Sequence, residues 1–312
     1  MNEGLIQTVN GPIQPNELGV TLMHEHLVST LKRDKQLNLD PIIQYKKHNG
    51  KTIVDVTPAG CHLQRAVDDL RDISVRTGIH IIASTGFYKE PYLPQQISQM
   101  SEEEIADIYV QEIEEGIEGT GIKAGVIGEV GSSYNQITDL EARILRAAGL
   151  AQRRTGIAVI THTTHGTMGL AQLQLLEQAG AELNRVVIGH CDLNPDLDYH
   201  LEVARRGAYL GYDTIGKERW LSAVPGEELA HRSDKERIYL ILKVLDAGLS
   251  ERIILSSDIL WQEINLNKKT LGRYMYTYVI FKFLGSLKDV GVDDKTLQLI
   301  LEINPRRVLS GR

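Results

Sequence analysis

Short apolar runs alternate with amphipathic segments along the whole chain, and this alternation constrains the fold more than any other feature. Runs rich in β-branched residues predict strands at residues 19–27, 52–57, 79–84, 122–130, 157–162, 185–190, 208–213 and 252–258. Helical spacing of apolar residues predicts helices at about 40–50, 62–76, 101–116, 138–155, 167–179, 195–206, 234–247, 274–288 and 293–303. Glycines such as Gly78 and Gly156 follow several of these helices, as is common at helix ends.

Strands joined by helices of this length run parallel, because each helix carries the chain back to the start of the next strand. Eight such units predict an α/β fold of the (β/α)₈ or TIM-barrel type. A doubly wound open sheet is the competing architecture, but no Gly-x-Gly-x-x-Gly or P-loop pattern follows a predicted strand. No linker divides the sequence, so we expect one barrel domain over residues 1–312.

Imidazole and carboxylate side chains recur where the predicted strands end. The C-terminal strand ends of such barrels carry the functional groups. The residues at these positions are His24, His26, Glu129, His162, His190 and Asp258. Because alternate residues of a strand share a face, His24 and His26 are expected to point the same way. Each residue has an ordinary alternative, such as a core histidine for His162 or a helix cap for Asp258, but their joint placement predicts a metal site.

The predicted donor set suits two divalent ions. Imidazole binds several borderline metals, and a carboxylate can bridge two ions. Zn²⁺ is the expected metal, with Mn²⁺ and Co²⁺ as alternatives. Cys191 follows His190 directly, so in a strand it would face the other side, and we expect a buried thiol rather than a ligand.

Five segments resemble the phosphotriesterase family of the amidohydrolase superfamily, in particular its branch of phosphotriesterase homology proteins and phosphotriesterase-like lactonases. The segments are 20–27, 123–129, 161–163, 189–192 and 257–258. The resemblance covers nearly the whole chain and implies a barrel with a two-metal centre. It implies that His24, His26 and Asp258 hold a buried ion. It also implies that His162 and His190 hold a more exposed ion.

The resemblance makes Glu129 the expected bridge between the two ions. Most family members use a carboxylated lysine on the fourth strand, whereas the phosphotriesterase homology proteins use a glutamate. Lys123 lies earlier on the predicted fourth strand and is badly placed for this role. The change of bridging group leaves the exact metal spacing open.

The expected reaction is hydrolysis of a lactone or carboxylic ester by attack of a metal-bridging hydroxide. Two ions that share a water lower its pKa toward about 7, and Asp258 is expected to be the catalytic residue that takes its proton. By resemblance, Tyr88 favours a lactonase, because triesterases have tryptophan at this position. Thr214 follows Asp213 where triesterases have a relay histidine, so that relay is not expected here.

Three cationic residues are expected to contact the substrate from the loops after the seventh and eighth strands. Lys217, Arg219 and Arg273 would suit a phosphate or carboxylate, and some family branches hydrolyse phosphorylated sugar lactones. The alternatives are a solvated mixed-charge surface for these cations and an ordinary loop aromatic for Tyr88. A phosphotriesterase, a cyclic-amide hydrolase and a non-catalytic metal-binding barrel stay open as alternative functions.

The composition argues against several other classes of protein. With a net charge of −7, the chain has no general electrostatic attraction for nucleic acid or anionic membranes. We find no long apolar run that predicts a membrane span and no signal-peptide pattern at the start. The two cysteines, Cys61 and Cys191, agree with a reducing cytoplasm. We therefore expect a cytoplasmic enzyme with a small-molecule substrate, and the resemblance implies a homodimer.

Overall fold

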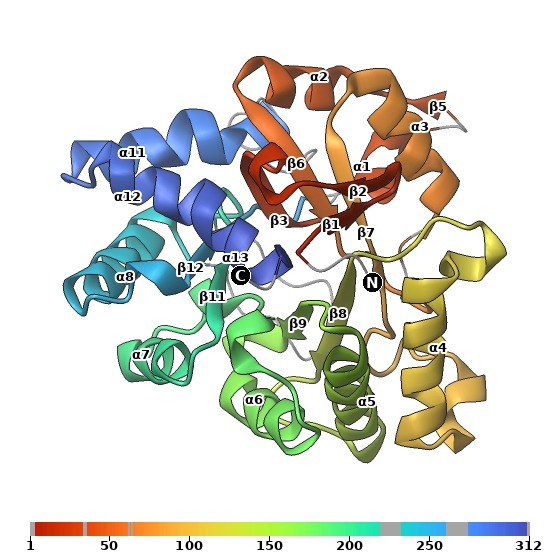
Figure 1. Cartoon of the computed structure of the whole chain (residues 1–312). Coiled ribbons are helices and arrows are strands. Elements are labelled where there is room, and N and C mark those ends of the chain that lie inside the picture. The colour runs from red at the N-terminus through yellow and green to blue at the C-terminus, as the bar shows by residue number, and fades with distance from the viewer. Residues whose placement is uncertain are drawn as a thin grey trace.

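Eight parallel strands form the central sheet in the order in which they follow one another along the chain (Figure 1). They are β3 (Val20–Glu25), β6 (Gly50–Asp55), β7 (His80–Thr85), β8 (Val126–Ser132), β9 (Val159–Thr163), β10 (Val186–Ile188), β11 (Tyr209–Tyr212) and β12 (Ile253–Leu255). The computed structural model describes residues 4–33, 36–61, 63, 65–218, 232–259 and 274–310. The predicted TIM barrel is confirmed.

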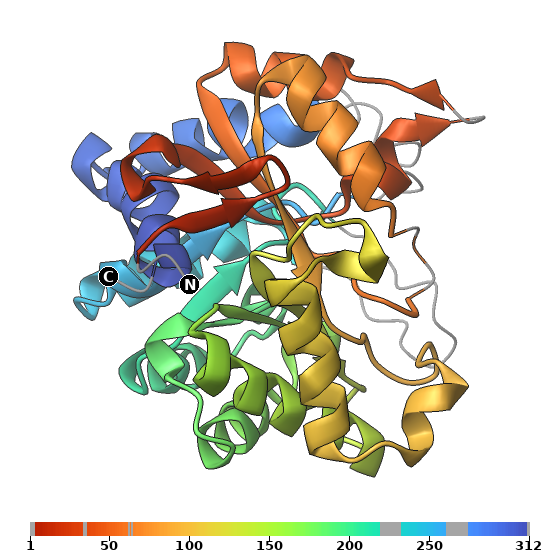
Figure 2. The same ribbon diagram turned by 45° about the vertical axis from the view of Figure 1, so that its right-hand side comes forward.

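Helices surround the sheet on its outer face, as both ribbon views show (Figures 1 and 2). Those that follow the first seven strands are α1 (Leu27–Leu31), α2 (Asp40–Lys47), α3 (Val67–Thr77), α4 (Glu102–Glu114), α5 (Asp139–Thr155), α6 (Gly169–Gln178), α7 (Leu197–Arg205) and α8 (Asp234–Asp246). The C-terminal part contains η8 (Met275–Thr277), η9 (Val279–Phe283), α11 (Leu284–Asp289), α12 (Asp294–Gln298), η10 (Leu299–Ile303) and α13 (Asn304–Ser310). A π-helical turn at η9 and another at η10 interrupt the two helices predicted there.

Local sequence signals set the ends of several helices. At the start of α4, Ser101 Oγ accepts a hydrogen bond from Glu104 N, and Ser101 N donates to the Glu104 carboxylate, which is the capping box that the sequence suggests. Gly78 and Gly156 end α3 and α5 with φ angles of 69° and 72°, which glycine adopts without a Cβ clash. The helix predicted from residue 62 begins only at Val67.

The barrel closes where β3 meets β12, the first and last strands of the order. His24 N donates to Ser256 Oγ at 3.0 Å, and Asp258 N donates to His24 O at 3.1 Å. The buried Glu25 carboxylate accepts hydrogen bonds from Ser257 N at 2.9 Å and Ile259 N at 3.0 Å. The seam therefore fixes the backbone on both sides of Asp258.

The interior of the barrel is a packed core, which extends to its N-terminal end. Its apolar cluster comprises Ile6, Leu18, Met23, Val54, Val56, Ile82, Val126, Ala158, Ile160, Val187, Tyr209, Ile254, Val308 and Leu309. The hairpin of β1 (Ile6–Thr8) and β2 (Gly11–Ile13), which the sequence analysis did not predict, contributes to this cluster together with α13. The first and last described residues, Gly4 and Ser310, both lie at this end of the barrel (Figure 1).

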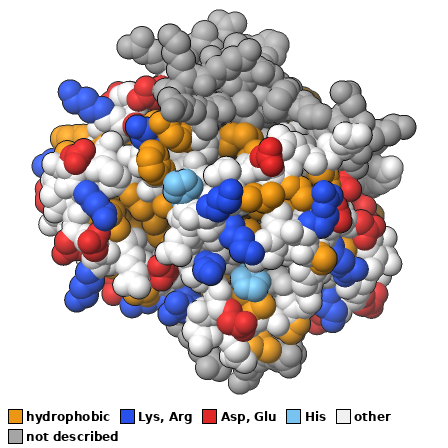
Figure 3. Space-filling view, turned by 90° about the horizontal axis from the view of Figure 1, so that it is seen from above, with side chains coloured by type: hydrophobic (Ala, Val, Ile, Leu, Met, Phe, Trp, Pro, Cys, Tyr) orange, Lys and Arg blue, Asp and Glu red, His pale blue; other side chains and the backbone are white. Residues whose placement is uncertain are grey.

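The outer surface mixes side chains of different kinds. On the face over α2 and α3, basic and acidic side chains are interspersed with apolar ones (Figure 3). A short two-stranded ribbon, β4 (Lys32–Arg33) and β5 (Gln36–Leu37), lies beyond α1. Within the described ranges, we find no helix with the length and apolar character needed to cross a membrane.

Candidate metal centre

The six predicted ligands come together at the C-terminal end of the barrel. One triad consists of His24, His26 and Asp258, and a second consists of Glu129, His162 and His190. Within each triad the potential ligand atoms lie within 4.8 Å of one another. The first triad is the group that the family resemblance implied for the buried ion, and the second joins the two histidines implied for the exposed ion to the implied bridge Glu129. The role of these residues as metal ligands stays a prediction.

Glu129 lies between the two triads. Its Oε1 is 3.4 Å from His26 Nε2, and its Oε2 is 3.2 Å from His24 Nε2 and 3.1 Å from His162 Nδ1. The residue lies within β8 rather than at its end, because this strand continues to Ser132. The pairing of β8 with β9 shifts register between Ile127 and Val130, around Glu129. A carboxylate in this place could contact an ion on either side.

Two candidate ligands lie where the backbone adopts a left-handed conformation. His190 has φ 57° and Asp258 has φ 47°, and such values are uncommon for residues other than glycine. β10 ends at Ile188, two residues earlier than predicted, so His190 follows the strand instead of ending it. Cys191 is buried and its thiol donates to Ile188 O, as expected for a thiol that is not a ligand. Backbone strain of this kind is concentrated at functional sites.

One histidine of the centre has no hydrogen-bond partner of acceptable geometry, and the protonation states of two other residues suit a metal. His24 Nε2 and Nδ1 are buried, and neither makes a hydrogen bond of acceptable geometry, although Glu129 Oε2 and Asp213 Oδ2 lie 3.2 and 3.1 Å away. Burial lowers the pKa of His162 to about 4 against the opposing effect of Glu129, so its imidazole is neutral at pH 7. Burial alone would raise the pKa of Glu129, but His162, His24 and His26 hold it well below the usual range. Neutral His162 beside ionised Glu129 has the form that binds a divalent metal. Burial alone would lower the pKa of His24, His26 and His190, but neighbouring carboxylates raise it, to about 10 for His26, so these imidazoles would have to release a proton when a metal binds.

Asp213 contacts two of the histidines at the ring nitrogens that face away from the centre. Its Oδ1 is 2.7 Å from His190 Nδ1, and its Oδ2 is 3.1 Å from His24 Nδ1. This leaves the Nε2 atoms of both rings facing the centre, the arrangement seen where a carboxylate supports a metal-binding histidine. In the sequence, Asp213 stands out only as the residue before Thr214. Its position directly after β11 is the signal that would have found it.

The predicted substrate residues have different outcomes. Tyr88 lies with its hydroxyl 3.3 Å from both ring nitrogens of His162, so it borders the second triad. Lys217 was expected above the barrel mouth, but it is 2% exposed and its Nζ lies 2.5 Å from Asp258 Oδ2. The ammonium group of Lys217 therefore lies beside a candidate metal ligand rather than at the surface. Arg219 and Arg273 lie outside the described residues.

A second buried lysine, which was not predicted from the sequence, borders the site. Lys89 follows Tyr88, and its Nζ lies 5.9 Å from the centre of the Tyr88 ring and 6.0 Å from that of Tyr92. Burial is the main cause of the lowered pKa of His162, and Glu129 opposes it. The positive charge of Lys89 lowers this pKa further. No sequence pattern distinguishes this lysine from a solvated one.

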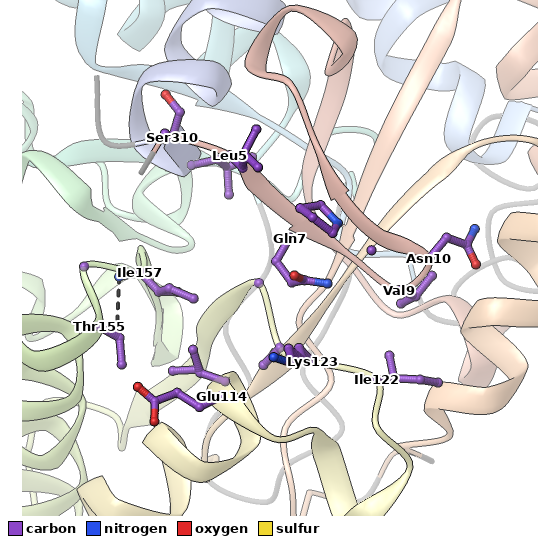
Figure 4. Close-up of a pocket in the computed structure, with 18 of the residues that line it drawn as sticks. Leu5, Gln7, Val9, Asn10, Glu114, Ile122, Lys123, Thr155, Ile157 and Ser310 are labelled. Atoms are coloured by element: carbon purple, nitrogen blue, oxygen red, sulfur yellow. Dashed lines mark hydrogen bonds between the residues drawn. The ribbon is translucent and has the colours of Figure 1, made fainter. Parts of the chain in front are cut away.

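A cavity of about 1260 Å³ lies at the opposite end of the barrel (Figure 4). Lys123 lines it together with Gln7, Asn10 and Glu114. The side chain of Lys123 is exposed there, before the start of β8, so it lies far along the barrel from Glu129. This agrees with the prediction that Lys123 is badly placed to act as a bridge.

Comparison with known proteins identifies the family. The family model described as "Phosphotriesterase family" matches residues 4–309. The phosphotriesterase homology protein of Escherichia coli (strain K12) is 35% identical over 297 residues, which cover 92% of this chain and 96% of that protein. The N-acetyltaurine hydrolase of Dictyostelium discoideum is 30% identical over 98% of both chains. A mutant phosphotriesterase-like lactonase of Deinococcus radiodurans superposes with a TM-score of 0.85 at 31% identity, covering 97% of this chain and 99% of the other. The chain therefore belongs to the phosphotriesterase family.

Proposed function

We propose that this chain is a metal-dependent hydrolase that acts on a lactone or carboxylic ester. The observation that carries the proposal is the pair of triads with Glu129 between them. His24, His26 and Asp258 would hold one divalent ion, and His162 and His190 would hold the other, with Glu129 shared. Zn²⁺ is the first candidate, and Mn²⁺ and Co²⁺ are alternatives. Bound ions would acidify a water and polarise the substrate oxygen.

Asp258 is the residue to which we assign the proton of the attacking water. Its Oδ1 lies 3.2 Å from His26 Nε2 and its Oδ2 lies 2.5 Å from Lys217 Nζ. Burial alone would raise the pKa of Asp258, but Lys217 and His26 hold it far below the usual range. The carboxylate is therefore ionised at neutral pH, which is the form required of both a metal ligand and a proton acceptor. Lys217 would then stabilise the ionised form and limit the movement of the side chain.

Tyr88 supports an acyl substrate. It lies against His162 with ring centres 4.9 Å apart, at the border of the proposed exposed ion. Its phenol is a hydrogen-bond donor that could contact the oxygen of a bound lactone. The resemblance to lactonases at this position and the lactonase among similar structures support the same choice. A cytoplasmic location, which the two free cysteines favour, and a homodimer, which the family resemblance implies, complete this proposal.

An N-acyl amide with an anionic end is the second candidate substrate. Relatives named N-acetyltaurine hydrolases match this chain nearly end to end at about 30% identity. Two buried ammonium groups, Lys89 and Lys217, border the proposed site, and such groups favour anionic substrates. Hydrolysis of an amide needs a better-stabilised leaving amine than hydrolysis of a lactone, but the attacking water is the same.

A panel of substrates tests the proposal. The protein is reconstituted with Zn²⁺ or Mn²⁺, and acid release is followed with a pH indicator. The panel contains sugar lactones with and without a phosphate, acyl-homoserine lactones, an aryl ester and an aryl phosphotriester. N-acetyltaurine is followed separately by the release of its amine. Turnover that is fastest on a lactone or ester supports the proposal, and faster turnover of N-acetyltaurine supports the second candidate.

Two results would contradict the lactonase proposal. A phosphotriester turned over far faster than every lactone would show that Tyr88 does not set an acyl preference. Bound metal without turnover of any member of the panel would favour the non-catalytic barrel. The variant Arg273→Ala tests the anion preference separately, because it should reduce the ratio of phosphorylated to plain lactone turnover if Arg273 holds the phosphate.

A further inference from the structure

A fully buried ion pair lies behind the candidate metal centre. Arg237 in α8 and Asp192 in η6 (Cys191–Leu193) have side chains that are 0% exposed, and Arg237 Nε donates to Asp192 Oδ2 at 2.5 Å. The guanidinium also donates through Nη2 to Thr214 Oγ1 at 2.7 Å and through Nη1 to Asp234 Oδ1 at 2.9 Å. One side chain therefore joins the segments that follow β10 and β11 to the start of α8.

The two acidic partners hold the segment from Asp213 to Lys217 at successive points. Asp192 accepts hydrogen bonds from Asp213 N at 3.3 Å and from Thr214 Oγ1 at 2.5 Å. Asp234 accepts a hydrogen bond from Gly216 N at 3.0 Å. Tyr278 holds Asp234 in turn, because its hydroxyl donates to Asp234 Oδ2 at 2.9 Å. The backbone of this segment is thus fixed from the side facing α8.

The same segment contacts the candidate ligands on its other side. Asp213 reaches His190 Nδ1 and His24 Nδ1, and Lys217 reaches Asp258 Oδ2. A displacement of the segment would therefore change contacts in both triads at once. Thr214 connects this segment to the buried ion pair, because its hydroxyl donates to Asp192 and accepts a hydrogen bond from Arg237.

Stability alone gives a poor reason for burying this ion pair. The cost of removing two charges from water often exceeds their mutual attraction, and apolar residues of similar volume usually serve as well. Hydrogen bonds from one guanidinium to three segments instead define a geometry, because the planar donor array has fixed directions. A metal site needs such support behind its ligands.

We infer that Arg237 is a positioning residue of the metal centre. Together with Asp192 it places the side chains of Asp213 and Lys217 against the candidate ligands. The inference rests on the proposed metal-dependent function, but it holds for any substrate, because its primary consequence is the affinity for the ions. It does not assign Arg237 any contact with the substrate.

The test compares Arg237→Lys with a matched variant of another nearly buried ion pair. Arg65 Nη2 lies 2.5 Å from Glu112 Oε2, and their side chains are 8% and 12% exposed. Neither belongs to the two triads or contacts Asp213 or Lys217 through a described interaction. Thermal unfolding of the metal-free proteins and Zn²⁺ affinity, measured by competition with a chromophoric chelator, are recorded for Arg237→Lys and Arg65→Lys. We expect both to unfold at lower temperature, but only Arg237→Lys to bind Zn²⁺ more weakly, by roughly 10–100-fold.

Equal Zn²⁺ affinities in the wild type, Arg237→Lys and Arg65→Lys would overturn the inference, whatever the loss of thermal stability. If Arg237→Lys does not fold, the Zn²⁺ affinities of Thr214→Val and Thr214→Ser are compared instead, because only serine retains the hydroxyl. Weaker Zn²⁺ binding in the valine variant, restored in the serine variant, supports positioning, and wild-type affinity in both contradicts it. A wild type that binds Zn²⁺ but hydrolyses no member of the substrate panel would refute the proposed activity and leave this comparison intact.

With an active substrate, Arg237→Lys should also lower kcat more than it raises KM. The reason is that the variant displaces catalytic groups without removing a substrate contact. A change confined to KM would contradict the positioning role.

Discussion

The two ends of the barrel treat charged side chains in opposite ways. At the C-terminal end, histidines and carboxylates from several strands lie buried within about 4 Å of one another. At the N-terminal end, two of the charged residues around the cavity donate hydrogen bonds to the backbone. Arg71 Nε donates to Val9 O at 3.2 Å, and Arg185 donates to Gly156 O. Charges buried close together destabilise the folded state, whereas hydrogen bonds from arginine side chains to the backbone stabilise it.

In a barrel with two polar ends, function is expected at the end where charged groups are buried close together. The cavity at the N-terminal end is large, but its cations have structural partners or face solvent. The C-terminal end contains His190 and Asp258 in left-handed conformations and His24 with two ring nitrogens that make no acceptable hydrogen bond. Unfavourable features that accumulate at one place are expected at a functional site. The predictions below test whether activity depends on one end and stability on the other.

Removal of metal should have the largest effect. Dialysis against a strong chelator should abolish turnover and lower the unfolding temperature, because ions that bind only the folded chain stabilise it. Without ions, the buried carboxylate Glu129 and the partly buried carboxylate Asp258 would each lose the positive charge of a bound metal. Activity and thermal unfolding are measured before chelation, after it, and after Zn²⁺ is restored. Full activity in a protein shown to be metal-free would contradict the assignment of the C-terminal end as a metal centre.

Asp258→Asn should have the next largest effect. The amide cannot accept the proton of the attacking water, and loss of a general base typically costs about 10³-fold in rate. It also removes the charge that Lys217 faces at 2.5 Å. Metal content and kcat are measured on the same sample, because we expect at least one ion to stay bound. Wild-type kcat in a metal-replete variant would exclude Asp258 as the base.

The sequence was sufficient for the barrel because strand and helix periodicity repeat along the chain. It was also sufficient to bring His24, His26 and Asp258 together, since residues at the C-terminal ends of parallel strands converge. Lys217 shows where this reasoning ends. A lysine in a loop looks solvated in the sequence, and only the tertiary ion pair with Asp258 reveals that it is buried.

The boundaries and supporting contacts were less predictable for the same reason. Glu129 lies inside β8 because the strand continues to Ser132, past a register shift in its pairing with β9 that no local pattern indicates. The β1–β2 hairpin has strands of three residues, too short to give a period. The buried pair of Arg237 and Asp192 joins residues 45 positions apart, so neither residue marks the other in the sequence.

Gly125→Ala should damage the N-terminal end without touching the reaction. A Cβ at this position would lie 2.4 Å from Gln7 O and 2.6 Å from Ile82 Cγ2, so the β1 backbone or the core must shift. Overpacking of this kind typically costs about 1–3 kcal/mol in the free energy of unfolding. Denaturant unfolding is compared with Gly285→Ala, where a Cβ meets nothing within 4 Å. A large loss of kcat in folded Gly125→Ala would show that the two ends are coupled.

Lys123→Met should have the smallest effect and makes the sharpest distinction between the ends. If Glu129 bridges the ions, Lys123 contributes nothing to them, because it is exposed at the opposite end of the barrel. Metal content should then be unchanged and kcat should stay within about twofold of the wild type, as is usual for surface substitutions. Glu129→Ala is the matched comparison, since it should lose metal and activity together. If Lys123→Met lost an ion and Glu129→Ala retained both, Lys123 rather than Glu129 would be the bridging ligand. The N-terminal end would then belong to the active centre.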